Sequence, residues 1–251
     1  MNKILVIGDS CEDVFVYGYC KRLSPEAPVP ILLPEETKKS SGMAANVYNN
    51  IRALGSKCDI ISNEKGPIKT RYIETESNQT LLRLDERDTI SRISDEVIGS
   101  INYDDYDAIV ISDYNKGFLW PEDIENISVN HSLVFLDSKK PLNKWCKYID
   151  VIKINEKEYF SNINWLDDNY EGELIITLGS HGSRYNCEIF PIEEQHPVRD
   201  LTGAGDTYLA ALVVEYLKTN DISKSIQFAN KCAAWVVTQK GVTVVDLNKM
   251  K

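Results

Sequence analysis

A glycine-rich turn with an acidic residue beside it is the part of this sequence best suited to chemistry. The turn is Thr202-Gly203-Ala204-Gly205-Asp206, and it precedes an apolar run, 209–217, that predicts a buried helix. With Thr202 as the expected N-cap, the small residues leave the first backbone N–H groups of that helix open to an anion. Asp206 would lie in the first turn beside the anion. This arrangement suits phosphoryl transfer to a hydroxyl, because the N–H groups stabilise the transferred group and the carboxylate takes the proton.

The same turn also has a plainer interpretation as a capped helix start, because Gly, Thr and Asp are common at such boundaries. On spacing alone the two interpretations are about equally supported. Two other phosphate-binding motifs are excluded. No Gly-x-x-x-x-Gly-Lys-Ser/Thr occurs, and Tyr208 stands where a dinucleotide fingerprint needs its last glycine.

The elements that must position this turn are predicted by alternating apolar runs. Strand-like runs at 4–7, 108–111, 133–136, 151–154 and 174–178 are separated by amphipathic segments. Such alternation predicts a parallel sheet with helices on both faces, and ligands then gather at the carboxyl ends of the strands. The polar stretches expected at those ends are Asp9, 112–117, Asp137, 155–158 and 179–182.

A second, smaller sheet is predicted outside the main one. The runs 14–19, 29–33 and 80–84 are rich in β-branched, aromatic and leucine residues, so we draw lid strands from about 13–34 and 70–85. Ser41 to Asn46 should open a helix that ends at Gly55. The stretch 62–67 is interpreted as a short bypass loop.

Length and charge limit the function classes. A chain of 251 residues suits one large α/β domain, and a formal net charge of −10 argues against nucleic-acid or anionic-lipid partners. Six scattered cysteines without a C-x-x-C pair predict reduced thiols in the cytoplasm, and the three histidines lack zinc-ligand spacing. The absence of a leader and of an apolar run near 18 residues predicts neither export nor a membrane span.

The glycine turn resembles the C-terminal signature of the ribokinase-like carbohydrate kinases, the PfkB family, which reads Asp-Thr-x-Gly-Ala-Gly-Asp. Leu201 replaces its first Thr. The stretches 8–13, 22–30 (Arg-Leu-Ser-Pro-Glu-Ala-Pro-Val-Pro) and 42–47 resemble the heptose 7-phosphate kinases within that family, although only Gly42 remains of an expected glycine pair. The resemblance covers nearly the whole chain, broken mainly at 62–69 and shortened around 186–198. It implies a ribokinase-like α/β fold in one domain, 1–251, with a small β-sheet lid.

The resemblance also implies site residues, with ATP and Mg²⁺ as cofactors. Asp206 would be the base, and the N–H groups of Gly203, Ala204 and Gly205 would hold the transferred group. The sugar phosphate would be held by Asp9, Asp13, Gly42, Asn46, Arg83 and Lys116. The nucleotide would be held by Asn155, Thr177, Gly179, Gly182 and Asn230, and Glu158 would help to hold the metal. Without the resemblance, Asp9 and Asp13 are better explained as solvated loop acids, and Asn230 fits an ordinary packed helix equally well.

The leading interpretation is therefore an ATP-dependent kinase that acts on the anomeric hydroxyl of a heptose 7-phosphate. A kinase for another sugar, or a catalytically weak regulatory paralogue that binds sugar or nucleotide, remains an alternative. The sequence predicts no adenylyl-transferring half, because no His-x-Gly-His occurs. A homodimer that pairs two lids is expected, since an isolated small sheet leaves an apolar face uncovered.

Overall fold

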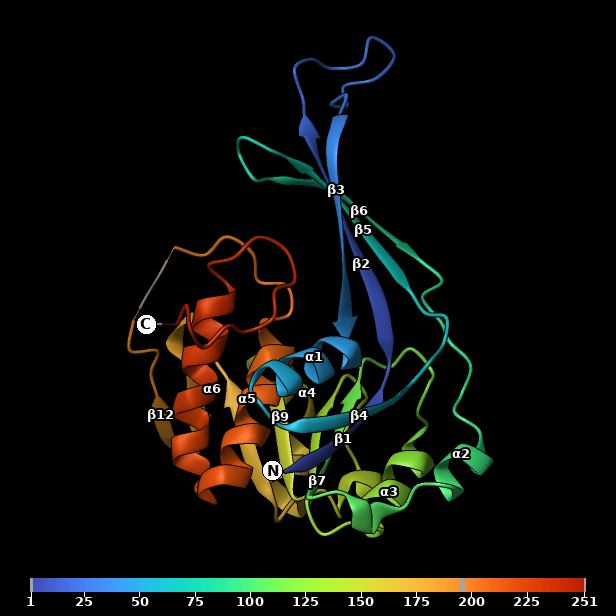
Figure 1. Ribbon diagram of the computed structural model, residues 1–251, viewed down its shortest axis with the longest axis vertical. Coiled ribbons are helices and arrows are strands. Elements are labelled where there is room, and N and C mark those ends of the chain that lie inside the picture. Colours follow the sequence, from blue (N-terminus) through green and yellow to red (C-terminus); the bar gives the residue numbers. More distant parts are fainter. Residues whose placement is uncertain (1, 195–196, 251) are drawn as a thin grey trace.

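The central feature is a mostly parallel sheet, seen in a computed structural model that describes residues 2–194 and 197–250. Within those residues its strand order is β12-β11-β10-β9-β8-β7-β1-β4 (Figure 1). The bounds are β1 Lys3–Gly8, β4 Lys57–Ser62, β7 Ala108–Asp113, β8 Val134–Ser138, β9 Val151–Asn155, β10 Glu173–Thr177, β11 Ser183–Tyr185 and β12 Glu188–Phe190. Strands β11 and β12 are antiparallel to their neighbours, and the other pairs are parallel. The predicted α/β class is confirmed.

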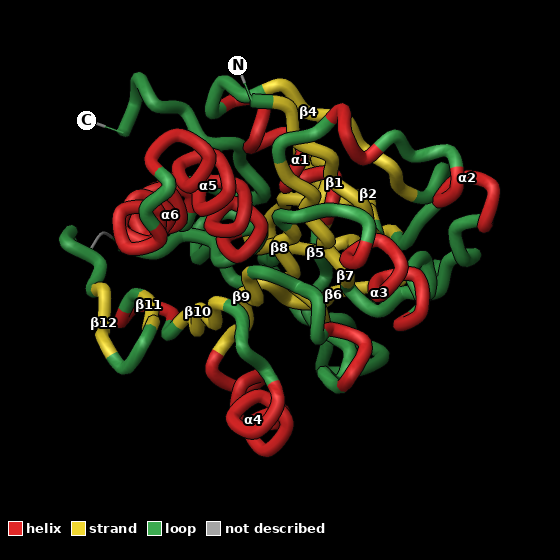
Figure 2. The backbone as a smooth tube through the Cα atoms, turned by 90° about the horizontal axis from the view of Figure 1, so that it is seen from below, coloured by secondary structure: helices red, strands yellow, loops and turns green. Residues whose placement is uncertain are grey.

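Helices cover both faces of this sheet because its strands are apolar on both sides. In β1, Ile4 and Val6 join one buried cluster with α1, α5 and α6, whereas Leu5 and Ile7 join another with α2, α3 and α4 (Figure 2). The helices are α1 Ala44–Ala53, α2 Asp95–Gly99, α3 Pro121–Val129, α4 Glu156–Asn169, α5 Ala204–Thr219 and α6 Ile222–Val236. Short 3₁₀ turns span Tyr103–Asp105, Lys144–Cys146 and Gly179–His181. None of the helices in the described ranges is long and apolar enough to cross a bilayer.

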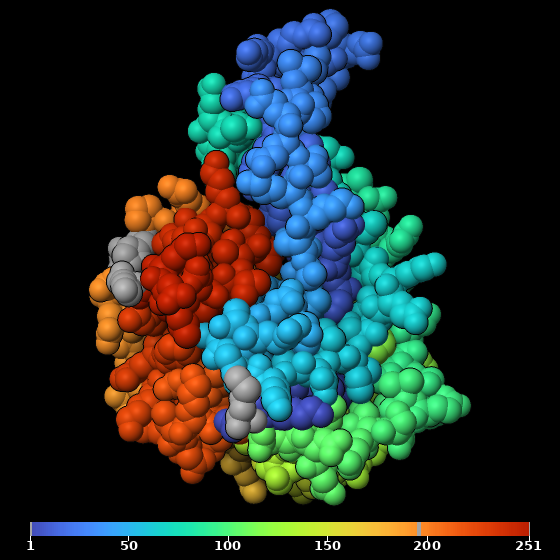
Figure 3. All heavy atoms as spheres, in the orientation of Figure 1, coloured from blue at the N-terminus to red at the C-terminus, as the bar shows by residue number. Residues whose placement is uncertain are grey.

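The lid is a separate four-stranded sheet that projects from the body (Figures 1 and 3). Its order is β3-β2-β5-β6, with bounds β2 Ser10–Tyr19, β3 Leu33–Met43, β5 Ile68–Glu74 and β6 Thr80–Glu86. Only one residue separates β1 from β2, and only 63–67 separates β4 from β5. The lid therefore continues directly from two strands of the central sheet, and the bypass at 63–67 is a short loop, as expected.

Two predicted elements differ from the structure. The lid strand expected at 29–33 is wrong, because the strand runs from Leu33 to Met43 and the 20–32 stretch forms the tip of the hairpin. Residues 35–41 are all polar, so this edge strand shows no apolar alternation to a pattern search. The helix expected from Ser41 begins at Ala44, because 41–43 still pair with β2.

The two faces of the lid differ in what they contact. Cross-strand partners place Phe15 beside Arg71 on the inner face, where Phe15 is buried against Gly241 and Val242 of the body. Leu82 and Leu84 point to the outer face and are 58% and 44% exposed. The exposed apolar residues of the lid are thus Leu82 and Leu84 on the outer face, with Leu23, Val29 and Leu33 at and beside the hairpin tip, and Phe15 does not belong to them.

Candidate active site

The glycine turn begins helix α5 in a way that only glycine allows. Gly203 is the N-cap with φ +81°, a left-handed conformation, and a Cβ atom there would lie 2.7 Å from Asn46 Nδ2. The expected N-cap, Thr202, is wrong, since its N–H and hydroxyl both donate to Asp200 Oδ1. No side chain caps the first N–H groups of α5, although Ala204 N–H donates to the Leu201 carbonyl at 3.3 Å. The other N–H groups at this helix start suit an anion site.

Asp206 lies in the first turn of α5, where two donors fix its carboxylate. The Tyr114 hydroxyl donates to Oδ1 at 2.6 Å, and Asn46 Nδ2 donates to Oδ2 at 3.0 Å. Asn46 comes from α1, and Tyr114 comes from the loop after β7. The carboxylate is 3% exposed, so it is held in one orientation away from bulk water.

Burial changes the acidity of this carboxyl. Desolvation raises the pKa of Asp206 to about 6, against the hydrogen bonds from Tyr114 and Asn46, which lower it. A carboxylate with this pKa is largely ionised at pH 7 and is more basic than an ordinary Asp. That combination suits a group that must accept a proton from a sugar hydroxyl.

Lys153, which sequence reasoning missed, lies at the mouth of the glycine turn. A Cβ atom on Gly205 would be 3.1 Å from its Nζ. Lys153 belongs to β9 and is buried, with Nζ 2.5 Å from Asp137 Oδ2. Because it interrupts an apolar strand, Val-Ile-Lys-Ile, the pattern indicated only a core strand. Its ammonium group stands where a phosphate on the turn would need a positive charge.

Asp137 and Glu158 are linked by one further lysine. Lys139 Nζ lies 3.0 Å from Asp137 Oδ1 and 2.7 Å from Glu158 Oε1. Burial acts to raise the pKa of Asp137, but Lys153 and Lys139 hold it below its ordinary value. The other Glu158 oxygen accepts from Asn155 N–H at 2.9 Å in a capping box at the start of α4. Both oxygens of the predicted metal ligand therefore have protein partners here.

Most of the predicted nucleotide residues meet in one cleft. Thr177, Gly179, Gly182 and Asn230 line a cavity of about 610 Å³ that also reaches Gly205 in the glycine turn. The amide of Asn230 is itself used, accepting from Ser183 Oγ and donating to the Phe190 carbonyl, both at 2.8 Å. Its packing role is thus evident, and contact with a nucleotide stays a prediction. Asn155 is not among the lining residues of this cleft.

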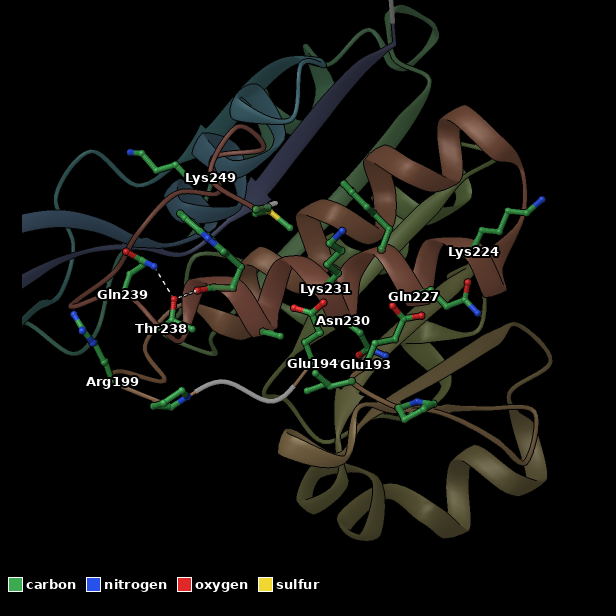
Figure 4. Close-up of a pocket in the computed structure, with 17 residues that line it drawn as sticks. Glu193, Glu194, Arg199, Lys224, Gln227, Asn230, Lys231, Thr238, Gln239 and Lys249 are labelled. Atoms are coloured by element: carbon green, nitrogen blue, oxygen red, sulfur yellow. Dashed lines mark hydrogen bonds between the residues drawn. The ribbon is translucent and has the colours of Figure 1, made fainter.

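A second, larger cavity of about 760 Å³ adjoins this cleft along α6 (Figure 4). The two share Ile192, Glu194, Asn230 and Ala234. Lys224, Gln227 and Lys231 are labelled along α6 in Figure 4. Ala204 and Gly205 of the glycine turn line the smaller cleft and not this larger space, so a phosphate on the turn is expected in the smaller cleft.

The predicted sugar residues lie between the lid and the body. On the inner face of the lid, Asp13 Oδ1 pairs with Arg71 at 2.5 Å. Gly42 is required there, since its Cβ would come within 2.1 Å of Asp13 Oδ2. Asp9 is fully buried and accepts three backbone N–H bonds from the 114–118 loop. Its carboxylate thus holds the loop that carries Tyr114, and direct contact of Asp9 with sugar stays a prediction.

Arg83 and Lys116, the remaining predicted sugar residues, are each paired with an acid. Arg83 makes two bonds of 2.6 Å to Asp85, and Lys116 Nζ is 2.5 Å from Asp88 Oδ1. Sequence reasoning also missed the role of Tyr114. It lies in the polar stretch expected after β7, and that position was the available signal.

Known structures with the same arrangement of strands and helices identify the fold class of this chain. The fold matches phosphofructokinase-2 from Escherichia coli with a TM-score of 0.76 and 13% identity, covering 100% of this chain and 97% of that one. It matches a ribokinase from Cryptococcus neoformans var. grubii serotype A in complex with ADP with a TM-score of 0.71 and 14% identity, covering 100% and 99%. The fold is therefore ribokinase-like.

Sequence comparison then gives the family. A family model described as pfkB family carbohydrate kinase matches residues 122–249, and the chain belongs to this family. The bifunctional protein HldE of Helicobacter pylori (strain J99) is 29% identical over 309 residues, covering 100% of this chain and 66% of that protein. The chain thus spans about two thirds of the length of this curated relative. Because the match is longer than the 251 residues here, the relative carries insertions that this chain lacks.

Asp206→Asn should abolish turnover and leave the fold at least as stable. Loss of the base should lower turnover by about two to four orders of magnitude. Folding raises the pKa of Asp206, so the free energy of unfolding increases as the pH falls through that pKa. Above pH about 6 the ionised carboxylate therefore destabilises the fold. The variant should therefore melt no lower than wild type at pH 8, and its advantage should shrink at pH 5. A variant that keeps more than about a tenth of the turnover would exclude Asp206 as the base.

The pH profile should report the same carboxyl. We expect kcat/KM to fall as the pH drops below about 6, because protonated Asp206 cannot accept a proton. Tyr114→Phe removes a donor that lowers this pKa, so the acid limb should move to higher pH. Tyr103→Phe is the matched control, since the Tyr103 hydroxyl is buried without a partner in the described chain. An acid limb that is the same in wild type and Tyr114→Phe would contradict this assignment.

Proposed function

We propose that this chain is an ATP-dependent kinase that phosphorylates the anomeric hydroxyl of a heptose 7-phosphate. The observation that carries the proposal is the position of Asp206. Its carboxylate is held by Tyr114 and Asn46 in the first turn of α5, next to Ala204 and Gly205, which line the smaller cleft. A base between a nucleotide cleft and a sugar site is the arrangement that phosphoryl transfer needs.

The transfer uses this geometry in one displacement. The sugar hydroxyl gives its proton to Asp206 as its oxygen bonds to the terminal phosphorus of ATP, and the bond from that phosphorus to the bridging oxygen breaks to release ADP. The N–H groups of the turn and Lys153 stabilise the negative charge on the transferred group. Because the transition state is loose, the hydroxyl proton leaves late, and a pKa of about 6 suffices.

The residues present fit ATP with Mg²⁺. The cleft of about 610 Å³ opens onto the glycine turn, and no cluster of three or more acidic, His or Cys side chains forms a metal cage in the described ranges. Mg²⁺ usually keeps several waters and binds through one or two carboxylates plus phosphates, so Glu158 alone is chemically sufficient. When bound, Mg²⁺ supplies charge that neutralises the phosphates. Because Lys139 Nζ contacts Glu158 Oε1, Lys139 would have to move away from that oxygen or contact it together with the metal.

The choice of a heptose phosphate is supported by two kinds of observation. The curated relative is named bifunctional protein HldE, and the stretch 22–30 resembles heptose 7-phosphate kinases. In a chain of net charge −10, Arg71, Arg83 and Lys116 at the lid are each paired with an acid, and Lys69 adds a positive charge that no acid pairs. A kinase for another phosphorylated sugar is the second candidate. The intact base and its two donors disfavour a catalytically weak paralogue.

Six free cysteines agree with the proposed cytoplasmic location.

A panel of sugars tests the reaction. ADP release should be measured with D-glycero-D-manno-heptose 7-phosphate, fructose 6-phosphate, ribose 5-phosphate and their unphosphorylated forms. We expect the heptose 7-phosphate to give the highest kcat/KM, and Asp206→Asn to remove the signal. A higher value with another phosphorylated sugar would favour the second candidate, and no ADP release above the Asp206→Asn background with any sugar would reject the kinase proposal.

We also propose a homodimer formed through the outer face of the lid. This face carries Leu82 and Leu84, and four strands cannot cover both of their own faces. A symmetric pairing of two lids would bury both leucines of each copy and steady the lid above the sugar.

Leu82→Asp with Leu84→Asp should give monomers. Wild type should sediment as a dimer at micromolar concentration, and the double variant should have a raised KM for sugar, because its lid is less well supported. Val129→Asp is the control, since Val129 is an equally exposed apolar residue on α3. A monomeric wild type, or a monomeric double variant with an unchanged KM, would count against the lid interface.

A further inference from the structure

Lys69 is a buried cation without an acidic partner. It lies on β5 with 8% of its surface exposed, and no carboxylate comes within ion-pair distance of it in the part of the chain that the structure describes. Its side chain instead lies over the ring of Tyr114, with Nζ 5.4 Å from the ring centroid. Its stem is buried, but Nζ is not one of the fully enclosed polar atoms of the described chain, so an unpaired ammonium group stays open to an anion that arrives from outside.

The neighbouring acids form no ion pair with Lys69, although two of them are its cross-strand partners. In the register of the lid, Lys69 lies between Asp13 and Asp85. Asp13 is bound by Arg71 at 2.5 Å, and Asp85 is bound by both arms of Arg83 at 2.6 Å. Each of these acids is therefore already matched by an arginine, and Lys69 is the extra positive charge.

Two other cations are close enough to act with Lys69. The pKa of Asp85 is lowered first by its hydrogen bonds from Arg83, and the charges of Lys69 and Lys116 also lower it, so all three cations act on this carboxylate. Lys116 is on the 114–118 loop, which Asp9 holds against the body. The cluster of Lys69, Arg83 and Lys116 thus joins the lid to the loop that carries Tyr114.

This cluster is distinct from the place where the transferred phosphoryl group would sit. That place has its own cation, Lys153, beside Gly205. Lys69 lies on the lid next to Asp13, on the side of Tyr114 where the sugar is expected. An anion bound by Lys69 would therefore belong to the sugar.

We infer that Lys69 recognises the phosphate already carried by the sugar and determines the preference for a phosphorylated over a free sugar. This assignment rests on the proposed function, and it makes Lys69 the residue that recognises the phosphate of the sugar substrate. A phosphate monoester offers charged oxygens to the ammonium group, with Arg83 and Lys116 able to share the charge. Because Tyr114 lies between Lys69 and Asp206, an anchored phosphate would also fix the distance from the sugar to the base.

The test compares three variants on pairs of sugars. Lys69→Met removes the charge and keeps the length, Lys69→Arg keeps the charge, and Lys65→Met removes a lysine that is exposed on the nearby loop. Dissociation constants are measured by calorimetry, and kcat/KM by ADP release. The pairs are heptose 7-phosphate with its free heptose, fructose 6-phosphate with fructose, and ribose 5-phosphate with ribose. Melting curves confirm that each variant is folded.

We expect Lys69→Met to weaken binding of the preferred phosphorylated sugar by about 10- to 100-fold, mainly through KM, as loss of a charge-assisted hydrogen bond predicts. Its effect on the free sugar should be within about threefold, since no such bond is lost there. Lys69→Arg should recover part of the affinity, and Lys65→Met should match wild type.

Three results would overturn the role of Lys69. They are an equal loss for both members of a pair, no loss for either, and a wild type that prefers no phosphorylated sugar to its free form. A wild type that binds heptose 7-phosphate but transfers no phosphoryl group to it would instead reject the proposed reaction. The binding comparison would then still decide the role of Lys69.

Discussion

The arrangement of the site depends on one buried carboxylate that need not touch substrate. Asp9 is the single residue between β1 and β2, and its oxygens accept three N–H bonds of 2.7–3.2 Å from the 114–118 loop. Its backbone carbonyl accepts the first N–H of α1, the helix that carries Asn46. Both donors to Asp206 are thus positioned from the junction of sheet and lid. Desolvation raises the pKa of Asp9, and the three N–H bonds act against that rise, so they are what makes an ionised acid tolerable there.

The fold could be predicted wherever apolar periodicity was strong. The strands near Ile4, Ala108, Val151 and Leu174 are buried on both sides, so their composition alone indicates a parallel sheet. The lid strand from Leu33 could not be found this way, because residues 33–39 are all exposed and 35–41 are all polar. Pattern reasoning detects burial against a core, and an edge strand that is exposed along most of its length leaves no such trace.

The chemistry of the site was predictable only in part. Composition and spacing identified the glycine turn and Asp206, since small residues before a helix have a direct backbone consequence. They did not identify Lys153 or Tyr114, because each acts on a residue distant in sequence. Nor could they distinguish a carboxylate that orders a loop, Asp9, from one that pairs with Arg71 on the inner face of the lid, Asp13. That distinction requires the hydrogen-bond partners, which only three-dimensional structure supplies.

The charges around the base meet two opposing needs. A lysine beside the glycine turn stabilises a phosphoryl group, yet its field also lowers the pKa of a nearby base. Here Asp137 pairs with Lys153, and the two act on Asp206 with opposite sign, the acid raising its pKa and the lysine lowering it. The ammonium group can thus stand next to the phosphate position while Asp206 keeps a pKa of about 6. Removing Asp137 would expose the base to an uncompensated cation and make it a weaker proton acceptor, which explains why a strong ion pair is buried beside the reacting atoms.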